Sequence, residues 1–148
     1  MAEIRISAFS AEHIKAAAKI EAETFSEPWS EESMKLLCTE AYPSFSISEG
    51  DELLAYIGTS RVLDELQILT VATAKSARRR GFGRALLEAL DEYAKENAIA
   101  LISLEVRESN TAAIELYRGA GYSVAGVRRG FYRFPTEDAL VMIKNFDN

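Results

Sequence analysis

The sequence predicts a mixed α/β domain with a largely antiparallel central sheet flanked by four helices. Three observations predict it. Hydrophobic residues make up 48% of the 148 residues, three strand patterns follow one another with only short turns between them, and a strand–helix–strand unit comes next. Short turns favour antiparallel pairing, whereas the longer connection implies one parallel crossover. Because a domain takes about 100–200 residues, the length predicts one domain over residues 1–148.

The first part of the chain predicts one strand and two helices. Glu3 to Phe9 alternates polar and apolar residues, which indicates a strand. Ser10 is the expected N-cap of an alanine-rich helix from about Ala11 to Thr24. After a break at Pro28, Ser30 is expected to cap a second helix. The first turn of that helix carries two glutamates, which suit the positive end of the helix dipole.

Strand patterns fill the middle of the chain and return towards its end. Phe45 to Ser48 and Leu53 to Val62 predict two strands with a turn at Gly50-Asp51, and Glu65 to Ala72 predicts a third. We expect these three to pair antiparallel because their connections are too short for a crossover. Further strands are expected at Ala100 to Val106, Tyr122 to Arg128 and Ala139 to Phe146.

Two apolar stripes in the second half predict helices. The first stripe, at i, i+4, i+7 and i+8, predicts a helix from Gly83 to Glu96. The second predicts a short helix that is capped by Asn110 and ends near Gly119 and Gly121. The stripes consist of Leu86, Leu90, Tyr93 and Ala94, and of Ala113, Leu116, Tyr117 and Ala120.

The net charge of −6 argues against two kinds of partner. It comes from 17 Lys and Arg against 23 Asp and Glu. Nucleic-acid binding needs a wide positive surface, and an anionic membrane would repel the chain, so neither is expected; a basic protein would suit this charge. No run reaches the ~18 apolar residues that span a membrane, and the start at Met1 lacks the pattern of a signal peptide. We therefore expect a cytoplasmic protein.

The chain has a single cysteine and a single histidine. A zinc site needs three or four such ligands, so no metal is expected. His13 lies in a polar stretch and is expected at the surface. Cys38 lies in the second predicted helix, away from the motifs described next, and is expected to serve as a small packing residue.

A glycine turn rich in arginine lies between a predicted strand and a predicted helix. The strand ends with residues 69–73, and Arg78-Arg79-Arg80-Gly81-Phe82-Gly83-Arg84 follows. Glycine lets the backbone turn tightly and approach a ligand, and a helix N-terminus offers free N–H groups. Together these features predict an anion site suited to phosphate.

Other phosphate motifs do not match this turn. A Walker sequence would need Gly-Lys-Ser/Thr, and a dinucleotide fingerprint would need a small residue where Leu86 stands. The remaining alternative is a solvated basic turn without a ligand. Four arginines in seven residues favour the functional interpretation, because stability gives no reason for them.

A second candidate site runs from strand to helix. Glu105 shares one strand face with Ser103 and Arg107, and Tyr117 lies on the apolar stripe of the following helix. By itself, a glutamate at such a position is more often a solvated strand carboxylate, and a tyrosine on an apolar stripe is more often a packed core residue. A tyrosine can also pack its ring and still present its hydroxyl.

The arginine–glycine turn resembles the Gln/Arg-x-x-Gly-x-Gly/Ala signature of the GNAT N-acetyltransferases, and the order of elements resembles the GNAT fold over essentially the whole chain. In that family the backbone amides of the turn hold the pyrophosphate of acetyl-coenzyme A, and a strand pairs with its pantetheine arm. The resemblance therefore implies acetyl-coenzyme A as co-substrate. It implies a binding site formed by Leu69, Thr70, Val71, Arg79, Arg80, Gly81, Phe82, Gly83 and Arg84.

The stretch from Leu104 to Tyr122 is similar to a narrower group, the bacterial ribosomal-protein-alanine N-acetyltransferases of the RimI type. That group has a glutamate as general base, a tyrosine as general acid and an asparagine that contacts coenzyme A. The resemblance carries these roles to Glu105, Tyr117 and Asn110. It implies that the substrate is the N-terminal alanine of a small-subunit ribosomal protein.

Two flanking stretches also resemble the RimI type: residues 25–30, with Pro28-Trp29-Ser30, and residues 128–139. The second departs from the usual Asn-Tyr-Tyr-Pro, because Gly130 replaces the asparagine and Phe131 replaces the first tyrosine. The hydroxyl of that tyrosine is absent here. A GNAT enzyme acting on another protein N-terminus, a lysine or a small amine stays open, as does an acyl-coenzyme-A-binding module without catalysis.

Overall fold

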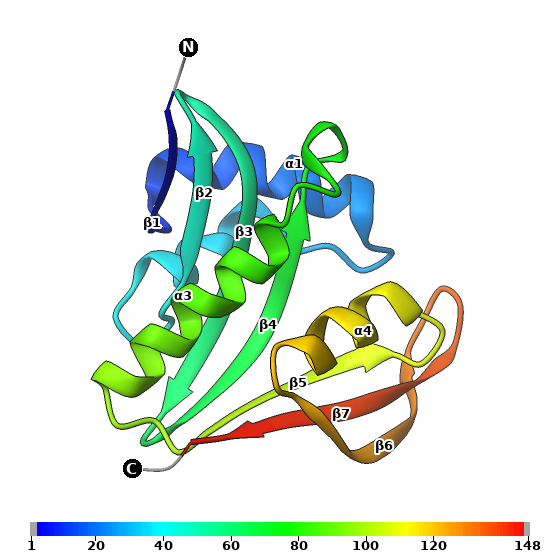
Figure 1. Ribbon diagram of the computed structural model, residues 1–148. Helices are drawn as coiled ribbons and strands as arrows, with labels where there is room; N and C mark the ends of the chain where they lie inside the picture. Colours follow the sequence, from blue (N-terminus) through cyan, green and yellow to red (C-terminus); the bar gives the residue numbers. More distant parts are fainter. Residues whose placement is uncertain (1–2, 147–148) are drawn as a thin grey trace.

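The computed structural model describes residues 3–146, in which seven strands form one sheet in the order β1-β2-β3-β4-β5-β7-β6 (Figure 1). All neighbours pair antiparallel except β4 and β5, which are parallel. The predicted mixed, largely antiparallel sheet is confirmed. The strands are β1 (Ile4–Ala8), β2 (Phe45–Glu49), β3 (Glu52–Val62), β4 (Glu65–Thr73), β5 (Leu101–Arg107), β6 (Ser123–Tyr132) and β7 (Glu137–Asn145).

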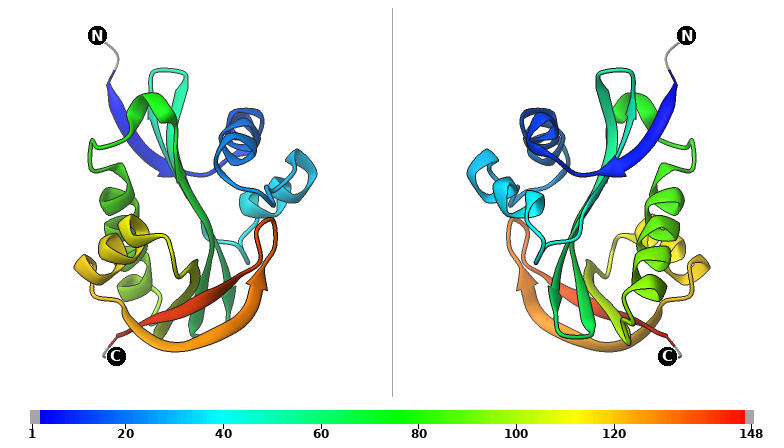
Figure 2. Two further views of the ribbon diagram at one scale, coloured as in Figure 1. Left: turned by 90° about the vertical axis from the view of Figure 1, so that its right-hand side faces the viewer. Right: turned by 90° about the vertical axis from the view of Figure 1, so that its left-hand side faces the viewer.

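Helices cover both faces of the sheet. Figure 2 shows α1 and α2 on one face and α3 and α4 on the other. The α-helices are α1 (Ile14–Thr24), α2 (Glu31–Met34), α3 (Phe82–Glu96) and α4 (Thr111–Gly119), and short 3-10 turns are at Ala11–His13, Lys35–Cys38 and Lys75–Ala77. Each predicted helix is present, although α2 is only one turn long. No helix in the described part of the chain is long and apolar enough to cross a membrane.

Two hydrophobic cores hold the layers together. The larger core lies between the sheet and α3 and α4, and the stripe of α3 contributes Leu86 and Leu90, both fully buried. The smaller core lies under α1 and α2 and contains Met34, Leu37 and Tyr56. Burying these side chains supplies most of the stabilisation, at about 25 cal/mol per Å² of apolar surface removed from water.

Two of the three predicted helix caps agree with the structure, whereas Ser10 precedes the 3-10 turn at Ala11–His13 and α1 begins only after His13. The Ser30 hydroxyl accepts a hydrogen bond from the backbone N–H of Ser33 at the start of α2. The Asn110 side chain accepts one from the N–H of Ala113 at the start of α4, at 3.2 Å. These side chains satisfy N–H groups that the helix itself leaves without acceptors.

Two predictions about isolated residues are wrong. His13 is buried rather than at the surface, because its ring packs against Phe9 and reaches the Ser46 hydroxyl on β2. Burial lowers the pKa of His13, so the neutral ring is favoured. Cys38 is exposed and does not fill a core position, since the short turn at Lys35–Cys38 directs Leu37 inwards instead.

The central parallel pair separates halfway along its length. Pairing runs from Glu65 with Leu101 to Ile68 with Leu104, and it stops there. Figure 1 shows β4 and β5 diverging beyond that point. On the other side of β4, a register shift against β3 leaves Leu69 as an extra residue. The bulge rotates the strand, so that Ile68 packs in the larger core while Thr70 reaches α1 on the opposite face.

Candidate active site

The arginine–glycine turn leads directly into α3. Gly81 is its N-cap, with a φ of +80° in the left-handed region, and no side chain caps this helix. A Cβ built on Gly81 would meet no protein atom within 4 Å. The first N–H groups of a 15-residue helix therefore face open space at the end where the dipole is positive.

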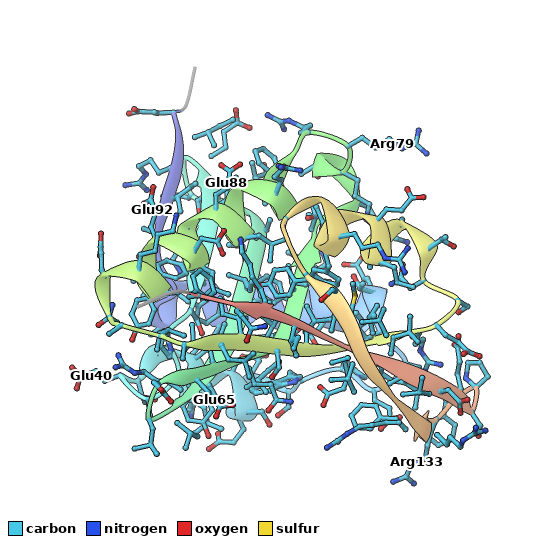
Figure 3. The ribbon with its side chains drawn as sticks, turned by 60° about the horizontal axis from the view of Figure 1, so that its bottom comes forward. Glu40, Glu65, Arg79, Glu88, Glu92 and Arg133 are labelled. Atoms are coloured by element: carbon cyan, nitrogen blue, oxygen red, sulfur yellow. The ribbon has the colours of Figure 1, made fainter. Side chains whose placement is uncertain are left out.

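The four arginines of the turn are not equivalent. The side chain of Arg79 lies at the surface at the edge of the molecule in Figure 3. The guanidinium of Arg80 lies 4.9 Å from the centre of the Phe82 ring. The two others bind protein groups: Arg78 donates to the Thr73 carbonyl at 3.4 Å, and Arg84 donates to the Gly119 carbonyl at 3.2 Å. Arg84 also lies 3.6 Å from the Glu88 carboxylate, which offsets its charge, so Arg79 and Arg80 present more positive charge to a ligand than Arg84 does.

The predicted strand site lies where β4 leaves β5. Leu69 and Val71 are half-buried, whereas Thr70 between them is buried and turned towards α1. Beyond Ile68, the side of β4 that faced β5 has no strand pairing within the described residues. This stretch of backbone can pair with an extended ligand.

Glu105 is the first residue of β5 beyond the part that pairs with β4. Its side chain is 13% exposed and lies on the face opposite the larger core. The Gln67 side-chain amide donates to both of its oxygens, at 3.0 and 3.3 Å. The exposed guanidinium of Arg128 on β6 lies 3.6 Å from Oε1. Glu105 is therefore a partly covered, oriented carboxylate rather than a freely solvated one.

Tyr117 lies on the inner side of α4, where its ring contacts that of Tyr122 edge-on at 6.0 Å. Burial, and to a smaller extent Tyr132, raises the pKa of Tyr117 well above its usual range. Burial, with Glu105 next, raises the pKa of Tyr132 to about 12. Tyr132 thus interacts electrostatically with both predicted catalytic residues. Both tyrosines keep their protons at neutral pH and can donate hydrogen bonds.

Asn110 lies at the start of α4, and its side-chain oxygen is occupied in capping that helix. Its role towards a cofactor would rest on the amide nitrogen. The substituted Gly130 has a φ of +61°, in the region that glycine and asparagine adopt most readily. Glycine therefore suits this backbone conformation, and the Gly130 N–H donates to Asp138 at 2.8 Å.

A network around Arg107 joins the loops on the Glu105 face. Its guanidinium donates to the carbonyls of Arg133 and Pro135, at 2.8 and 2.9 Å, and to Ser26 and Glu137, at 3.2 and 3.1 Å. The 132–137 loop is thereby tied to the segment that follows α1, and Figure 2 shows the two lying side by side. Arg133 itself extends outwards at the edge of this loop (Figure 3).

Sequence reasoning did not predict the roles of Gln67, Arg107 or Tyr132. Gln67 shares a strand face with Leu69 in an ideal strand, and its contact with Glu105 spans 38 residues of sequence. A polar side chain at a half-buried strand position was the available signal for both Gln67 and Arg107. For Tyr132, the resemblance to the RimI type marked the segment but assigned no role.

A model described as the acetyltransferase (GNAT) family matches residues 14–122. The fold and this match define the class: the chain is an N-acetyltransferase. It belongs to the acetyltransferase (GNAT) family, and the predicted fold class and enzyme class are confirmed.

Individual relatives are similar to the chain over almost its whole length. The [ribosomal protein bS18]-alanine N-acetyltransferase of Escherichia coli strain K12 is 37% identical over 141 residues, which are 93% of this chain and 94% of the relative. The crystal structure of the ribosomal-protein-S18-alanine N-acetyltransferase from Escherichia coli has a TM-score of 0.91 at 34% identity, covering 99% of this chain and 96% of that one. Arabidopsis thaliana NAA60 in complex with acetyl-CoA shares the fold, with a TM-score of 0.89 at 17% identity over 97% of this chain and 100% of that chain.

Proposed function

We propose that the chain, as one domain over residues 1–148, is an acetyl-coenzyme-A-dependent Nα-acetyltransferase acting in the cytoplasm. Its proposed substrate is the N-terminal alanine of a small-subunit ribosomal protein. The observation that carries the proposal is the placement of Glu105 and Leu69, which are the first residues of β5 and β4 beyond their last pair. The similarity to the bS18-alanine N-acetyltransferases supports this choice of substrate.

The residues of the turn and of β4 fit acetyl-coenzyme A. Open space beside Gly81, free N–H groups at the start of α3 and the exposed Arg79 suit a pyrophosphate. On the side of β4 that faced β5, the backbone at Leu69 and Val71 has no strand partner among the described residues and can pair with an extended arm. When bound, acetyl-coenzyme A would supply the acetyl group as a thioester.

Glu105 and Tyr117 would handle the protons. We propose direct attack of the acceptor amine on the thioester, with Glu105 accepting the proton that the amine gives up, directly or through water. The Gln67 amide holds that carboxylate in place. The Tyr117 hydroxyl would donate a hydrogen bond or its proton to the departing sulfur, and its raised pKa keeps it protonated for that purpose.

An α-amine suits a site with one evident base. Only the neutral amine attacks, and a terminal α-amine has a pKa of ~7.7–8.0 against ~10.4 for lysine. The difference of roughly 2.5 units corresponds to about 3.4 kcal/mol at neutral pH. A lysine acceptor would therefore need additional help.

An N-terminal alanine peptide should be acetylated, and a formyl group on its α-amine should abolish the reaction even when lysines remain. Formylation removes the nucleophile and leaves every other contact of the peptide intact. Mass spectrometry of both peptides after incubation with the protein and acetyl-coenzyme A measures this. Efficient acetylation of the blocked peptide on lysine would reject the α-amine assignment and favour a lysine acetyltransferase of the same family.

Replacing Tyr117 by phenylalanine should lower kcat by about 10²-fold and leave the acetyl-coenzyme A Kd unchanged. The change removes only the hydroxyl from a packed ring. Because the pKa of Tyr117 is raised, the wild-type hydroxyl stays protonated as pH rises, and kcat should not fall between pH 8 and 10. Steady-state kinetics across this range tests both expectations.

Two results would contradict the assignment of Tyr117. A phenylalanine variant within a few-fold of wild type would leave Tyr117 with a packing role only. An alkaline loss of kcat below pH 10, absent from the phenylalanine variant, would show that its proton is lost too early. The matched control is Tyr42→Phe, since Tyr42 lies outside the proposed machinery.

The alternative that is not an enzyme is a module that binds acyl-coenzyme A without catalysis. It would need the Gly81 turn but neither Glu105 nor its Gln67 partner. The oriented carboxylate favours an enzyme. Membership of the acetyltransferase (GNAT) family also favours the enzyme.

A further inference from the structure

The carboxylate of Glu21 on α1 is buried and has no part in the chemistry above. The residue is 1% exposed. Its Oε2 accepts hydrogen bonds from the Tyr56 hydroxyl on β3, at 2.6 Å, and from the Thr70 hydroxyl on β4. Its Oε1 accepts one from the backbone N–H of Trp29, at 3.0 Å. One oxygen therefore binds the sheet and the other binds the loop that follows α1.

The loop held by Oε1 comprises residues 25–30, between α1 and α2. Its residues are exposed except for Trp29, which is half-buried and packs against the smaller core. At its other end the loop touches the 132–137 loop, since Ser26 donates to the Arg133 carbonyl and Glu27 accepts from the Arg133 N–H. Arg107, two residues after Glu105 on β5, donates to Ser26 and to the Arg133 carbonyl, so both loops lie close to the proposed base. We therefore place the acceptor peptide beside them.

The sheet residue held by Oε2 belongs to the proposed cofactor strand. Thr70 lies between Leu69 and Val71, whose backbone would pair with acetyl-coenzyme A. A single carboxylate thus connects the acceptor side of the site to its cofactor side. The two oxygens of this carboxylate thus fix the position of the Trp29 backbone relative to β4.

The buried carboxylate is the common acceptor of three donors. Burying a charge costs free energy, which apolar packing of the whole cluster would avoid. Replacing Glu21 alone by an apolar side chain would leave the Tyr56 and Thr70 hydroxyls and the Trp29 N–H without their acceptor. The carboxylate fixes a position that apolar packing would not fix.

We propose that Glu21 is a positioning residue, which holds the 25–30 loop in register with β4 so that the acceptor amine meets the acetyl group beside Glu105. This inference rests on the proposed function and adds a residue to it. Glu21 does not touch the reacting atoms and acts through the Trp29 backbone. Its loss should therefore weaken acceptor binding more than cofactor binding.

Two substitutions distinguish the hydrogen bond to Trp29 from the effect of filling the buried position of Glu21. Glu21→Leu keeps most of the volume but removes both acceptor oxygens. Glu21→Gln keeps one oxygen, which can face the Trp29 N–H, while the amide nitrogen faces two hydroxyls that can rotate to accept. Leucine should therefore raise the peptide KM about tenfold, as expected for one lost hydrogen bond to a charged group, and glutamine should stay within threefold of wild type.

The matched control is Tyr56→Phe, which removes a donor to the same carboxylate and leaves the bond to Trp29 intact. The peptide KM and kcat are measured at saturating acetyl-coenzyme A with an N-terminal alanine peptide. Calorimetry gives the acetyl-coenzyme A Kd, and thermal unfolding gives the Tm of each variant. We expect Tyr56→Phe to lower the Tm without raising the peptide KM, and Glu21→Leu to change the acetyl-coenzyme A Kd less than twofold.

Hydrogen exchange of the wild-type protein tests the proposal without depending on whether a variant folds. The Trp29 amide should exchange at least about tenfold more slowly than its exposed neighbour Ser30, because only the former has a buried acceptor. Equal exchange would overturn the proposal. The proposal would also be overturned if the peptide KM rose in proportion to the loss of Tm in both Glu21→Leu and Tyr56→Phe. If the wild-type protein acetylates no peptide, the proposed function fails, whereas a wild-type KM in Glu21→Leu rejects only this inference.

Discussion

Replacing Glu105 by glutamine is expected to lower kcat by about 10²–10⁴-fold, the usual contribution of a general base. The amide cannot take the proton from the acceptor amine. The fold should persist, because the glutamine oxygen can still accept a hydrogen bond from Gln67. Acetyl-coenzyme A affinity, measured by calorimetry, should stay unchanged, and the loss should fall on kcat rather than on KM.

Glu108→Gln is the matched control for this change. Glu108 is exposed and lies three residues further along the same segment. Its replacement removes the same charge from the chain and should leave kcat within twofold of wild type. If Glu105→Gln and Glu108→Gln behave alike, Glu105 is not the base, and its contacts with Gln67 and Arg128 are purely structural.

Replacing both Gly81 and Gly83 by valine should weaken acetyl-coenzyme A binding by about 100-fold or more. This corresponds to two lost hydrogen bonds to a charged group at about 1.5 kcal/mol each. A β-branched residue is strained at the φ of +80° found at position 81. At position 83, a Cβ would lie 3.0 Å from the Leu116 side chain. Both changes displace the first N–H groups of α3.

Calorimetric titration with acetyl-coenzyme A measures this loss, and chelators should not alter the wild-type affinity. Gly126→Val is the control, because a Cβ at Gly126 meets no protein atom within 4 Å and its backbone is not left-handed. It should bind as the wild type does. Unchanged affinity in the Gly81/Gly83 double variant would place the cofactor away from this turn.

Local patterns carried much of the prediction. The period of α3 showed which face is buried, because a helix repeats every 3.6 residues and Leu86 and Leu90 fall on one side. The turn at Gly50 and the cap at Asn110 were readable for the same reason, since each depends on a few neighbouring residues. The one parallel pair also followed from the order of elements, because a strand–helix–strand unit leaves few other connections.

The functional roles of Glu105 and Tyr117 were predicted from the resemblance to the RimI type and not from local sequence patterns. The residues around Glu105 and Tyr117 are compatible with packing or with catalysis when each is considered separately. Only similarity to a family assigned them roles. Those assignments stay predictions until the variants above are measured.

The order of the strands and helices, the helix faces and the basic turn at Gly81 could be predicted from the sequence, because these depend on short-range periodicity and backbone preference. Which side chains meet became apparent in the folded protein. It brought Gln67 and Arg128 to Glu105, buried His13 and exposed Cys38, and connected Glu21 to Trp29 and β4. Burial and pairing between distant segments depend on the register of the whole sheet, where a bulge at one residue, Leu69, changes which side chains face each side.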